Sequence, residues 1–151
     1  MLTIEEIRTK PQVVLEKRPE VVAAHLFGSS VFGRTHPQSD VDIALFVEEK
    51  AYQKLDKAEP YGYKARMMVE LMEALGTDRV GLVLLHGAPP LLAHEVIARG
   101  KLLFSQDEKA RLSFEVATKH RYMDTKPLRE IKHYHLYERT KRGEFSKLSP
   151  T

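Results

Sequence analysis

Two apolar segments of seven residues each, 21–27 and 41–47, constrain the fold of this chain more than any other feature of its sequence. Their length and their apolar, partly β-branched composition favour buried β-strands. Residues 63–75 instead carry apolar side chains at helical spacing and are followed by a glycine, which is typical of a helix end. Further apolar strands are expected at 80–85 and 101–104. The alternation of strands with helices predicts an α/β (α+β) core.

The remaining segments have helical patterns that contain prolines. Residues 4–17 form one predicted helix, in which Pro11 marks either a break or a helical first turn. Another begins at Pro89-Pro90 and continues to residue 98. From residue 107 to residue 142 the pattern is again helical, and Pro127 predicts a break or a kink.

The composition is that of an ordinary globular protein, with 42% hydrophobic and 30% charged residues. We expect one domain, with a core at 1–105 and a C-terminal helical extension of the same domain at 106–151. No apolar run approaches the ~18 residues that span a bilayer, and the N-terminus lacks the apolar core of a secretory signal. The absence of cysteine excludes disulfides, thiol catalysis and cysteine-ligated zinc. These features fit a cytoplasmic protein.

The first two predicted strands are joined to residues that suit phosphate and metal chemistry. Gly28, Ser29 and Ser30 follow the first strand, and ten residues then separate Ser29 from Asp40. A glycine lets the backbone approach a phosphate closely, and a helix that starts there points free N–H groups at it. A serine hydroxyl can add a hydrogen bond. Asp40 and Asp42 open the second strand, where residues two apart project from the same face.

Two adjacent carboxylates repel each other unless a cation lies between them. Mg²⁺ takes one or two carboxylates and completes its shell with phosphate oxygens and water. Gly-Ser alone could be a common turn, and Asp-x-Asp alone could be a solvated strand edge, but together they favour a magnesium–nucleoside triphosphate site. Arg34 could contact the triphosphate, or it could be a solvated loop charge.

The arrangement Gly-Ser-x10-Asp-x-Asp resembles the polymerase-beta-like nucleotidyltransferase superfamily, and more closely its minimal nucleotidyltransferase (MNT) group. The likeness extends to Ala88-Pro89-Pro90-Leu91-Leu92, which is similar to a helix of that group, and to Gly100-Lys101-Leu102-Leu103-Phe104, which is similar to the strand that follows. The resemblance covers residues 20–105. It implies the nucleotidyltransferase fold, a short twisted mixed sheet flanked by helices with the site at one sheet edge.

MNT proteins are often paired with a HEPN-type ribonuclease in toxin–antitoxin modules, where the MNT antitoxin transfers AMP from ATP to a tyrosine of the toxin. The resemblance implies the same for this chain: a protein adenylyltransferase that uses Mg²⁺ and ATP and has a HEPN-type toxin as its partner. It implies that Asp40 and Asp42 are catalytic and bind the metal, and that Gly28, Ser29 and Ser30 hold the triphosphate. Contact with a membrane or directly with nucleic acid is not expected.

The chain departs from the superfamily at a third carboxylate, which is often taken as a base or a metal ligand. Its place falls on Gly81, and the nearest acid is Asp78. An odd offset along a strand points to the opposite face, so Asp78 substitutes only if the backbone bends at Gly76-Thr77. Replacing Gly81 with Asp is expected to add the acid and raise the rate. Two alternatives stay open: a catalytically weak module that neutralises its partner by binding, and a nucleotidyltransferase that modifies a small molecule.

The C-terminal segment is basic, with nine Lys or Arg residues against four Asp or Glu residues between Lys119 and Lys147. Such a segment can be a solvated helix face or can contact an acidic partner. It is longer than the core needs, which leads us to the hypothesis that it docks the partner protein.

Overall fold

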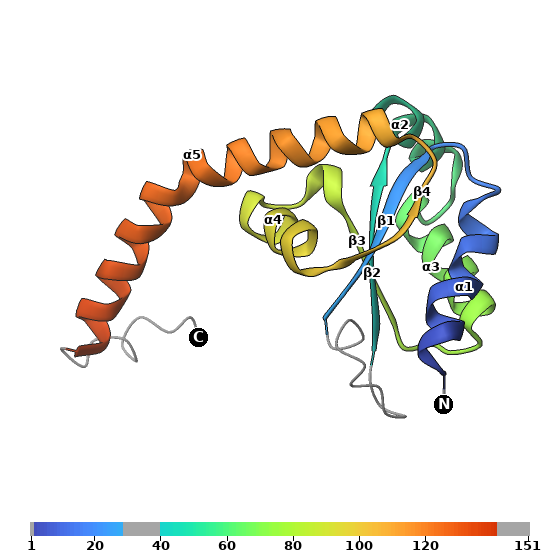
Figure 1. The fold of residues 1–151 in the computed structure, drawn as a ribbon, viewed down its shortest axis with the longest axis horizontal. Coiled ribbons are helices and arrows are strands. Elements are labelled where there is room, and N and C mark those ends of the chain that lie inside the picture. Colours follow the sequence, from blue (N-terminus) through green and yellow to red (C-terminus); the bar gives the residue numbers. More distant parts are fainter. Residues whose placement is uncertain (1, 29–39, 142–151) are drawn as a thin grey trace.

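The computed structural model describes residues 2–28 and 40–141 and contains one four-stranded sheet in the order β3-β2-β1-β4 (Figure 1). The strands are β1 (Val21–Phe27), β2 (Val41–Val47), β3 (Val80–Leu84) and β4 (Lys101–Ser105). β1 runs antiparallel to both β2 and β4, whereas β2 runs parallel to β3. The sheet is therefore mixed, as predicted, and β4 is an edge strand.

Helices cover both faces of the sheet (Figure 1). Their bounds are α1 (Ile4–Leu15), α2 (Glu49–Ala58), α3 (Tyr63–Leu75), α4 (Pro90–Arg99) and α5 (Glu108–Lys141), with a short 3₁₀ turn at Leu85–Gly87. α1 and α3 pack together on one face, whereas α4 and the start of α5 pack on the other. The predicted flanking of a mixed sheet by helices is confirmed.

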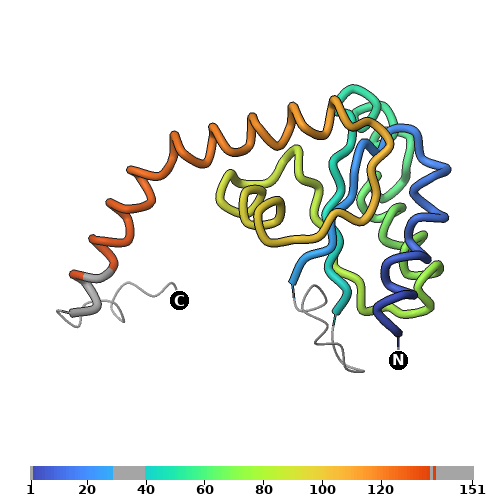
Figure 2. Tube along the Cα trace, in the orientation of Figure 1, coloured from blue at the N-terminus to red at the C-terminus, as the bar shows by residue number. Residues whose placement is uncertain are grey.

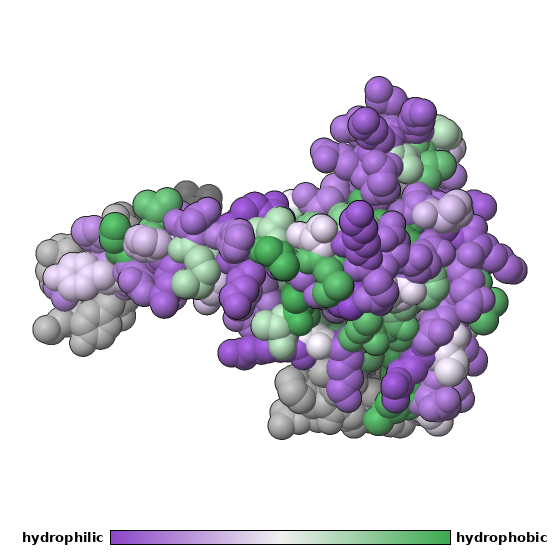
Figure 3. Space-filling model, turned by 45° about the horizontal axis from the view of Figure 1, so that its top comes forward, coloured by the Kyte–Doolittle hydropathy of each residue, from purple (hydrophilic) through white to green (hydrophobic). Residues whose placement is uncertain are grey.

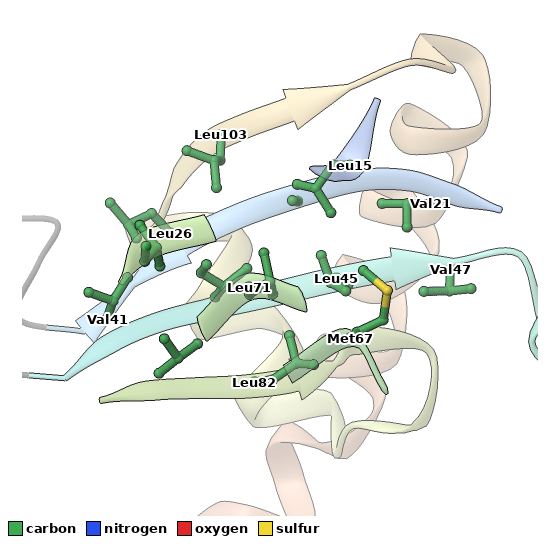
Figure 4. Close-up of a cluster of buried hydrophobic side chains, with 14 of the residues drawn as sticks. Leu15, Val21, Leu26, Val41, Leu45, Val47, Met67, Leu71, Leu82 and Leu103 are labelled. Atoms are coloured by element: carbon green, nitrogen blue, oxygen red, sulfur yellow. The ribbon is translucent and has the colours of Figure 1, made fainter. Parts of the chain in front are cut away.

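Two apolar clusters fix which face of the sheet each side chain occupies. Between the sheet and α1 and α3, the larger cluster takes alternate residues of β2 (Figure 4). These are Val41, Ile43, Leu45 and Val47. Ala44 belongs to the smaller cluster under α4. Because side chains alternate along a strand, Asp42 and Asp40 project from the face that carries Ala44.

Capping side chains and a glycine mark the ends of several helices. The Thr3 hydroxyl accepts a hydrogen bond from the backbone N–H of Glu6 at 3.1 Å and caps α1. At the start of α2, the Glu48 carboxylate accepts one from the N–H of Ala51 at 2.6 Å. Gly76 ends α3 with a φ of +69°, a left-handed conformation that favours glycine.

Three helices differ from what the sequence predicted. α1 continues through Pro11, and α5 continues through Pro127, so neither proline ends a helix. The bend of α5 visible in Figure 1 agrees with the expected kink, because proline removes one helical hydrogen bond. α2 was not expected at all. The division at residues 105 and 106 stays a prediction.

α5 has 34 residues and projects beyond the rest of the fold (Figures 1 and 2). Its first half is attached to the sheet. Phe114 stacks on Phe46 of β2 with ring centroids 4.1 Å apart, and Glu115 lies 3.5 Å from His25 of β1. Among the described residues, no helix combines the length and the apolar character needed to cross a membrane.

Candidate functional site

The candidate site lies where β1 ends and β2 begins. Gly28 directly follows β1, and its neighbour Phe27 is paired with Asp42 of β2. Gly28 has a φ of +77°, which L side chains rarely adopt. A Cβ at this position would lie 2.4 Å from Asp42 Oδ2, which is too close for any real contact. Two features favour glycine at residue 28: its backbone conformation, and the position of the Asp42 carboxylate, which a side chain here would displace.

Gly81 lies against the same carboxylate. Asp42 is paired with Gly81 across the parallel ladder of β2 and β3. A Cβ at residue 81 would lie 2.5 Å from Asp42 Oδ1. The Asp42 carboxylate is thus placed beside two glycines, one from each neighbouring strand, and each of its oxygens fills the space of one missing side chain.

The two predicted metal-binding carboxylates are close enough for Asp40 to act on Asp42. Asp42 is half-buried, whereas Asp40 is exposed directly before β2. Burial raises the pKa of the Asp42 carboxyl, and the negative charge of Asp40 raises that pKa further. A cation between the two carboxylates would remove this repulsion. The structure brings Asp40 and Asp42 together on one face, as the alternation of the strand predicts.

Arg79 adds a positive charge at this end of the sheet. Its Nη1 atom lies 3.8 Å from Asp40 Oδ1, and its backbone carbonyl accepts a hydrogen bond from the N–H of Val41 at 2.9 Å. The sequence pattern did not single out Arg79. Its role depends on the parallel pairing of β2 with β3, and the one local signal is that it directly precedes the third strand.

The other predicted site residues have different outcomes. Asp78 is exposed in the bend before β3, and the residue opposite Asp42 is Gly81, not Asp78. The role of Asp78 as a third carboxylate stays a prediction. Ser29, Ser30 and Arg34 lie outside the described residues.

The donor set suits a divalent cation that is shared with a nucleotide. Within the described part of the chain, no three His, Cys, Asp or Glu side chains gather closely enough to hold a metal ion. Asp40 and Asp42 alone supply two carboxylates, and Mg²⁺ with few protein ligands relies on phosphate oxygens to complete its shell. The residues present therefore fit a magnesium–triphosphate complex better than a permanently bound metal.

Comparison with known proteins agrees with this geometry. Residues 10–109 match the family model described as polymerase beta, nucleotidyltransferase. The chain is 28% identical over 105 residues to the protein adenylyltransferase MntA of Aphanizomenon flos-aquae (strain 2012/KM1/D3), covering 69% of this chain and 70% of that protein.

Solved structures of toxin–antitoxin complexes are similar in fold. A chain from a crystal structure of a toxin–antitoxin with AMP-PNP matches with a TM-score of 0.69 and 26% identity, covering 86% of this chain and 98% of that one. A chain from the complex of tri-AMPylated Shewanella oneidensis HEPN toxin with MNT antitoxin matches with a TM-score of 0.61 and 22% identity, covering 87% and 98%. The family match spans more than half of this sequence and includes Gly28, Asp40, Asp42 and Gly81. The chain therefore belongs to the polymerase beta nucleotidyltransferase family.

Proposed function

We propose that this chain is an antitoxin that transfers AMP from Mg²⁺-bound ATP to a tyrosine of a HEPN-type toxin. The observation that carries this proposal is the placement of the Asp42 carboxylate against Gly28, with Asp40 beside it. Similarity to a protein adenylyltransferase, to a complex with AMP-PNP and to a complex with AMPylated HEPN toxin supports the choice of reaction and partner.

The reaction forms one bond and breaks one bond at the α-phosphorus of ATP. The phenolic oxygen of the acceptor tyrosine bonds to the α-phosphorus, the bond from that phosphorus to the bridging oxygen breaks, and pyrophosphate leaves. The phenolic proton passes to solvent. A bound Mg²⁺ supplies positive charge to the phosphate oxygens as this exchange proceeds.

The residues of the chain act mainly by positioning the nucleotide. Asp40 and Asp42 hold the cation, and Gly28 allows the triphosphate to approach the backbone. Ser29, Ser30 and Arg34 keep their predicted role as triphosphate ligands. A tyrosine hydroxyl, with an ordinary pKa of about 10, is more acidic than a sugar hydroxyl, so the acceptor tolerates a weak or absent base. The use of ATP is also consistent with a cytoplasmic location.

The partner-docking surface in this proposal is an apolar stripe on α5, hereafter the outer stripe. Its members are Leu112, Val116, Met123, Ile131 and Tyr134, each more than half exposed. At 3.6 residues per turn they lie within about 100° of the helix circumference. Apolar side chains are visible along the projecting helix in Figure 3. Exposed apolar stripes on soluble proteins commonly mark interaction surfaces.

The net positive charge of α5 favours an acidic protein as the partner that binds this surface. α5 carries nine Lys or Arg residues and five Asp or Glu residues. A partner with apolar side chains framed by acidic ones would complement it. We assign this occupant to the HEPN-type toxin, which is the protein that carries the acceptor tyrosine.

A second candidate function is neutralisation of the toxin by binding alone. The absence of an acid at Gly81 favours it, since the base that a third carboxylate could supply is missing. General-base catalysis typically contributes about 10²–10⁴-fold to a rate, so its loss slows a transfer reaction without abolishing it.

Isotope transfer from ATP labelled at different phosphates separates the two functions. The chain is mixed with Mg²⁺ and a HEPN-type protein encoded beside it, and label on the partner is measured. We expect label from [α-³²P]ATP and none from [γ-³²P]ATP, because pyrophosphate leaves. Asp42→Asn and a Phe substitution at the acceptor tyrosine should each abolish labelling. If the wild-type chain binds the partner but transfers no label, binding alone accounts for the antitoxin function.

A further inference from the structure

Among the described residues, this end of the sheet brings the Arg79 guanidinium close to the carboxylates of Asp40 and Asp42. Arg79 directly precedes β3, and the parallel pairing of Val41 with Val80 places the backbone of Arg79 next to that of Asp40. The hydrogen bond from the Val41 N–H to the Arg79 carbonyl, 2.9 Å long, fixes this register. The side chains of Arg79 and Asp40 are 48% and 62% exposed, so the guanidinium lies within reach of a ligand bound at the carboxylates.

Residue 81 is a glycine, so β3 places no carboxylate opposite Asp42. The space at residue 81 is filled by Asp42 Oδ1, and the space at residue 28 is filled by Asp42 Oδ2. Any side chain at either position would displace the Asp42 carboxylate from its place. In the described part of the chain, Asp42 therefore has Asp40 beside it, and Gly81 supplies no third carboxylate.

The number of protein carboxylates then bears on the number of cations. Two divalent cations about 3.5–4 Å apart carry four positive charges and repel strongly unless anionic groups surround them. Asp40 and Asp42 are the carboxylates that β2 supplies, and the other anionic ligands come from the triphosphate, so a second divalent cation would have to share these same two carboxylates. One divalent cation together with the Arg79 guanidinium needs no third protein carboxylate, which Gly81 does not offer.

We propose that this is a single-cation site, in which Asp40 and Asp42 hold one divalent cation and the Arg79 guanidinium adds positive charge beside the triphosphate. The inference rests on the proposed function. In it Arg79 is a nucleotide-binding residue that pairs with Asp40 before ATP binds and contacts phosphate oxygens afterwards. Guanidinium groups suit that task because they present several donors to phosphate oxygens at once.

Counting Mn²⁺ ions tests the proposal without any transfer reaction. The full chain is saturated with AMP-PNP and titrated with Mn²⁺, and free Mn²⁺ is measured by its electron paramagnetic resonance signal. Titration of the Asp40→Asn/Asp42→Asn double variant gives the background from other sites. We expect one Mn²⁺ per bound nucleotide. Two tightly bound Mn²⁺ ions per nucleotide would overturn the proposal.

Arginine substitutions test whether Arg79 binds the nucleotide. At saturating Mn²⁺, Arg79→Ala should weaken AMP-PNP binding by about ten- to hundredfold, the size expected for a charge-assisted hydrogen bond. Arg79→Lys should recover part of the affinity. Arg99→Ala is the matched control, because Arg99 is also an exposed arginine paired with an acid, Glu95 at 3.1 Å, but lies on α4. Equal affinity in Arg79→Ala and Arg99→Ala would refute the role of Arg79.

The Mn²⁺ count and the Arg79 affinities test the single-cation site, and the transfer assay tests the proposed reaction, so one proposal can fail without the other. One bound Mn²⁺ and a loss of affinity in Arg79→Ala, without AMP transfer, would reject the proposed reaction and support the single-cation site. AMP transfer with two bound Mn²⁺ ions would support the reaction and reject the single-cation site.

Discussion

The rings of His94 on α4 and Tyr122 on α5 are stacked, with centroids 3.7 Å apart and planes within 9° of parallel. The Arg129 guanidinium lies over the same tyrosine ring, 4.0 Å from its centroid. The His94–Tyr122 stack attaches α5 to α4 as far as Tyr122, and the Arg129 contact lies within α5. Ile131 and Tyr134 of the outer stripe lie beyond the attached part and are exposed, so substitutions there should leave the fold unchanged.

Ile131→Asp combined with Tyr134→Asp should weaken binding of the HEPN-type partner by about ten- to hundredfold, because it places charge in the centre of the proposed apolar contact. Affinity is measured by calorimetry with the purified partner. His133→Asp is the matched control, since His133 is exposed on the same helix but points away from the outer stripe. If the control loses as much affinity as the double variant, net charge and not the stripe governs docking.

Gly28→Ala should abolish binding of Mg²⁺-ATP, because its Cβ would displace the Asp42 carboxylate. Gly76→Ala is a control for backbone strain, since Gly76 also has a positive φ but has no atom within 4 Å of an added Cβ. Both variants should lose about 1–2 kcal/mol of unfolding free energy. Calorimetric titration with Mg²⁺-ATP and urea denaturation give the two quantities. Retained ATP binding in Gly28→Ala would contradict the site.

Asp78→Asn should leave Mg²⁺-ATP affinity and AMP transfer within about twofold of wild type, because the strand register places Gly81 and not Asp78 beside Asp42. Asp42→Asn should lose more than about 100-fold in affinity, since even residues that only support a metal ligand contribute 10–100-fold. A large rate loss in Asp78→Asn, measured with [α-³²P]ATP, would identify Asp78 as the third carboxylate.

The stability of the chain should fall as the pH decreases from 7.5 to 5.5. Burial lowers the pKa of His25, and the nearby positive charge of Arg111 lowers it further. The neighbouring Glu115 raises this pKa and offsets part of the effect. The unfolded chain, with an ordinary histidine pKa of about 6.5, therefore takes up a proton before the folded chain does, which favours unfolding at acidic pH. Burial lowers the pKa of His86 in the same direction.

Urea denaturation at the two pH values measures this dependence. His25→Gln should reduce the change in unfolding free energy between pH 7.5 and pH 5.5, leaving the part that comes from His86. His133→Gln, a substitution of an exposed histidine, should keep the wild-type dependence. An unchanged pH dependence in His25→Gln would show that His25 is not the group responsible.

Tyr63→Phe should destabilise the fold by about 1–3 kcal/mol, because it leaves the Glu20 carboxylate buried without its donor. The Tyr63 hydroxyl donates to Glu20 Oε2 at 2.6 Å in the core, and burial together with Glu20 raises the Tyr63 pKa well above its usual range. Tyr61→Phe, at a residue 91% exposed, should change the unfolding free energy by less than about 0.5 kcal/mol. Thermal melts of both variants make the comparison.

The sequence predicted those elements whose apolar pattern is long and regular. The strands at 21–27 and 41–47 and the helix at 63–75 have the expected bounds. α2 was missed because it has few apolar residues, although Tyr52 and Leu55 lie at helical spacing and pack against the larger cluster. Pro11 lies buried within α1, where packing against the core outweighs its local preference to end a helix.

The site was predictable in part. The alternation of Asp40 and Asp42 could be derived from strand geometry, but the importance of Arg79 and the meaning of Gly81 depend on which strands are neighbours. From the sequence, Gly81 is a position that lacks an acid, and Gly81→Asp is expected to raise the rate. In the structure its Cβ would meet Asp42 Oδ1 at 2.5 Å, so we now expect Gly81→Asp to lower nucleotide affinity.

The length of α5 has a consequence for which tyrosine is modified. At 1.5 Å per residue, a helix of 34 residues is about 50 Å long, and its attached half is fixed to the sheet that carries Asp42. A partner held on the outer half would present to ATP only a tyrosine at the matching distance. Selection would then follow spacing and not the amino acids around the acceptor. One residue inserted after Arg129 would turn the outer half by about 100° and should redirect or stop modification while AMP-PNP binding stays unchanged.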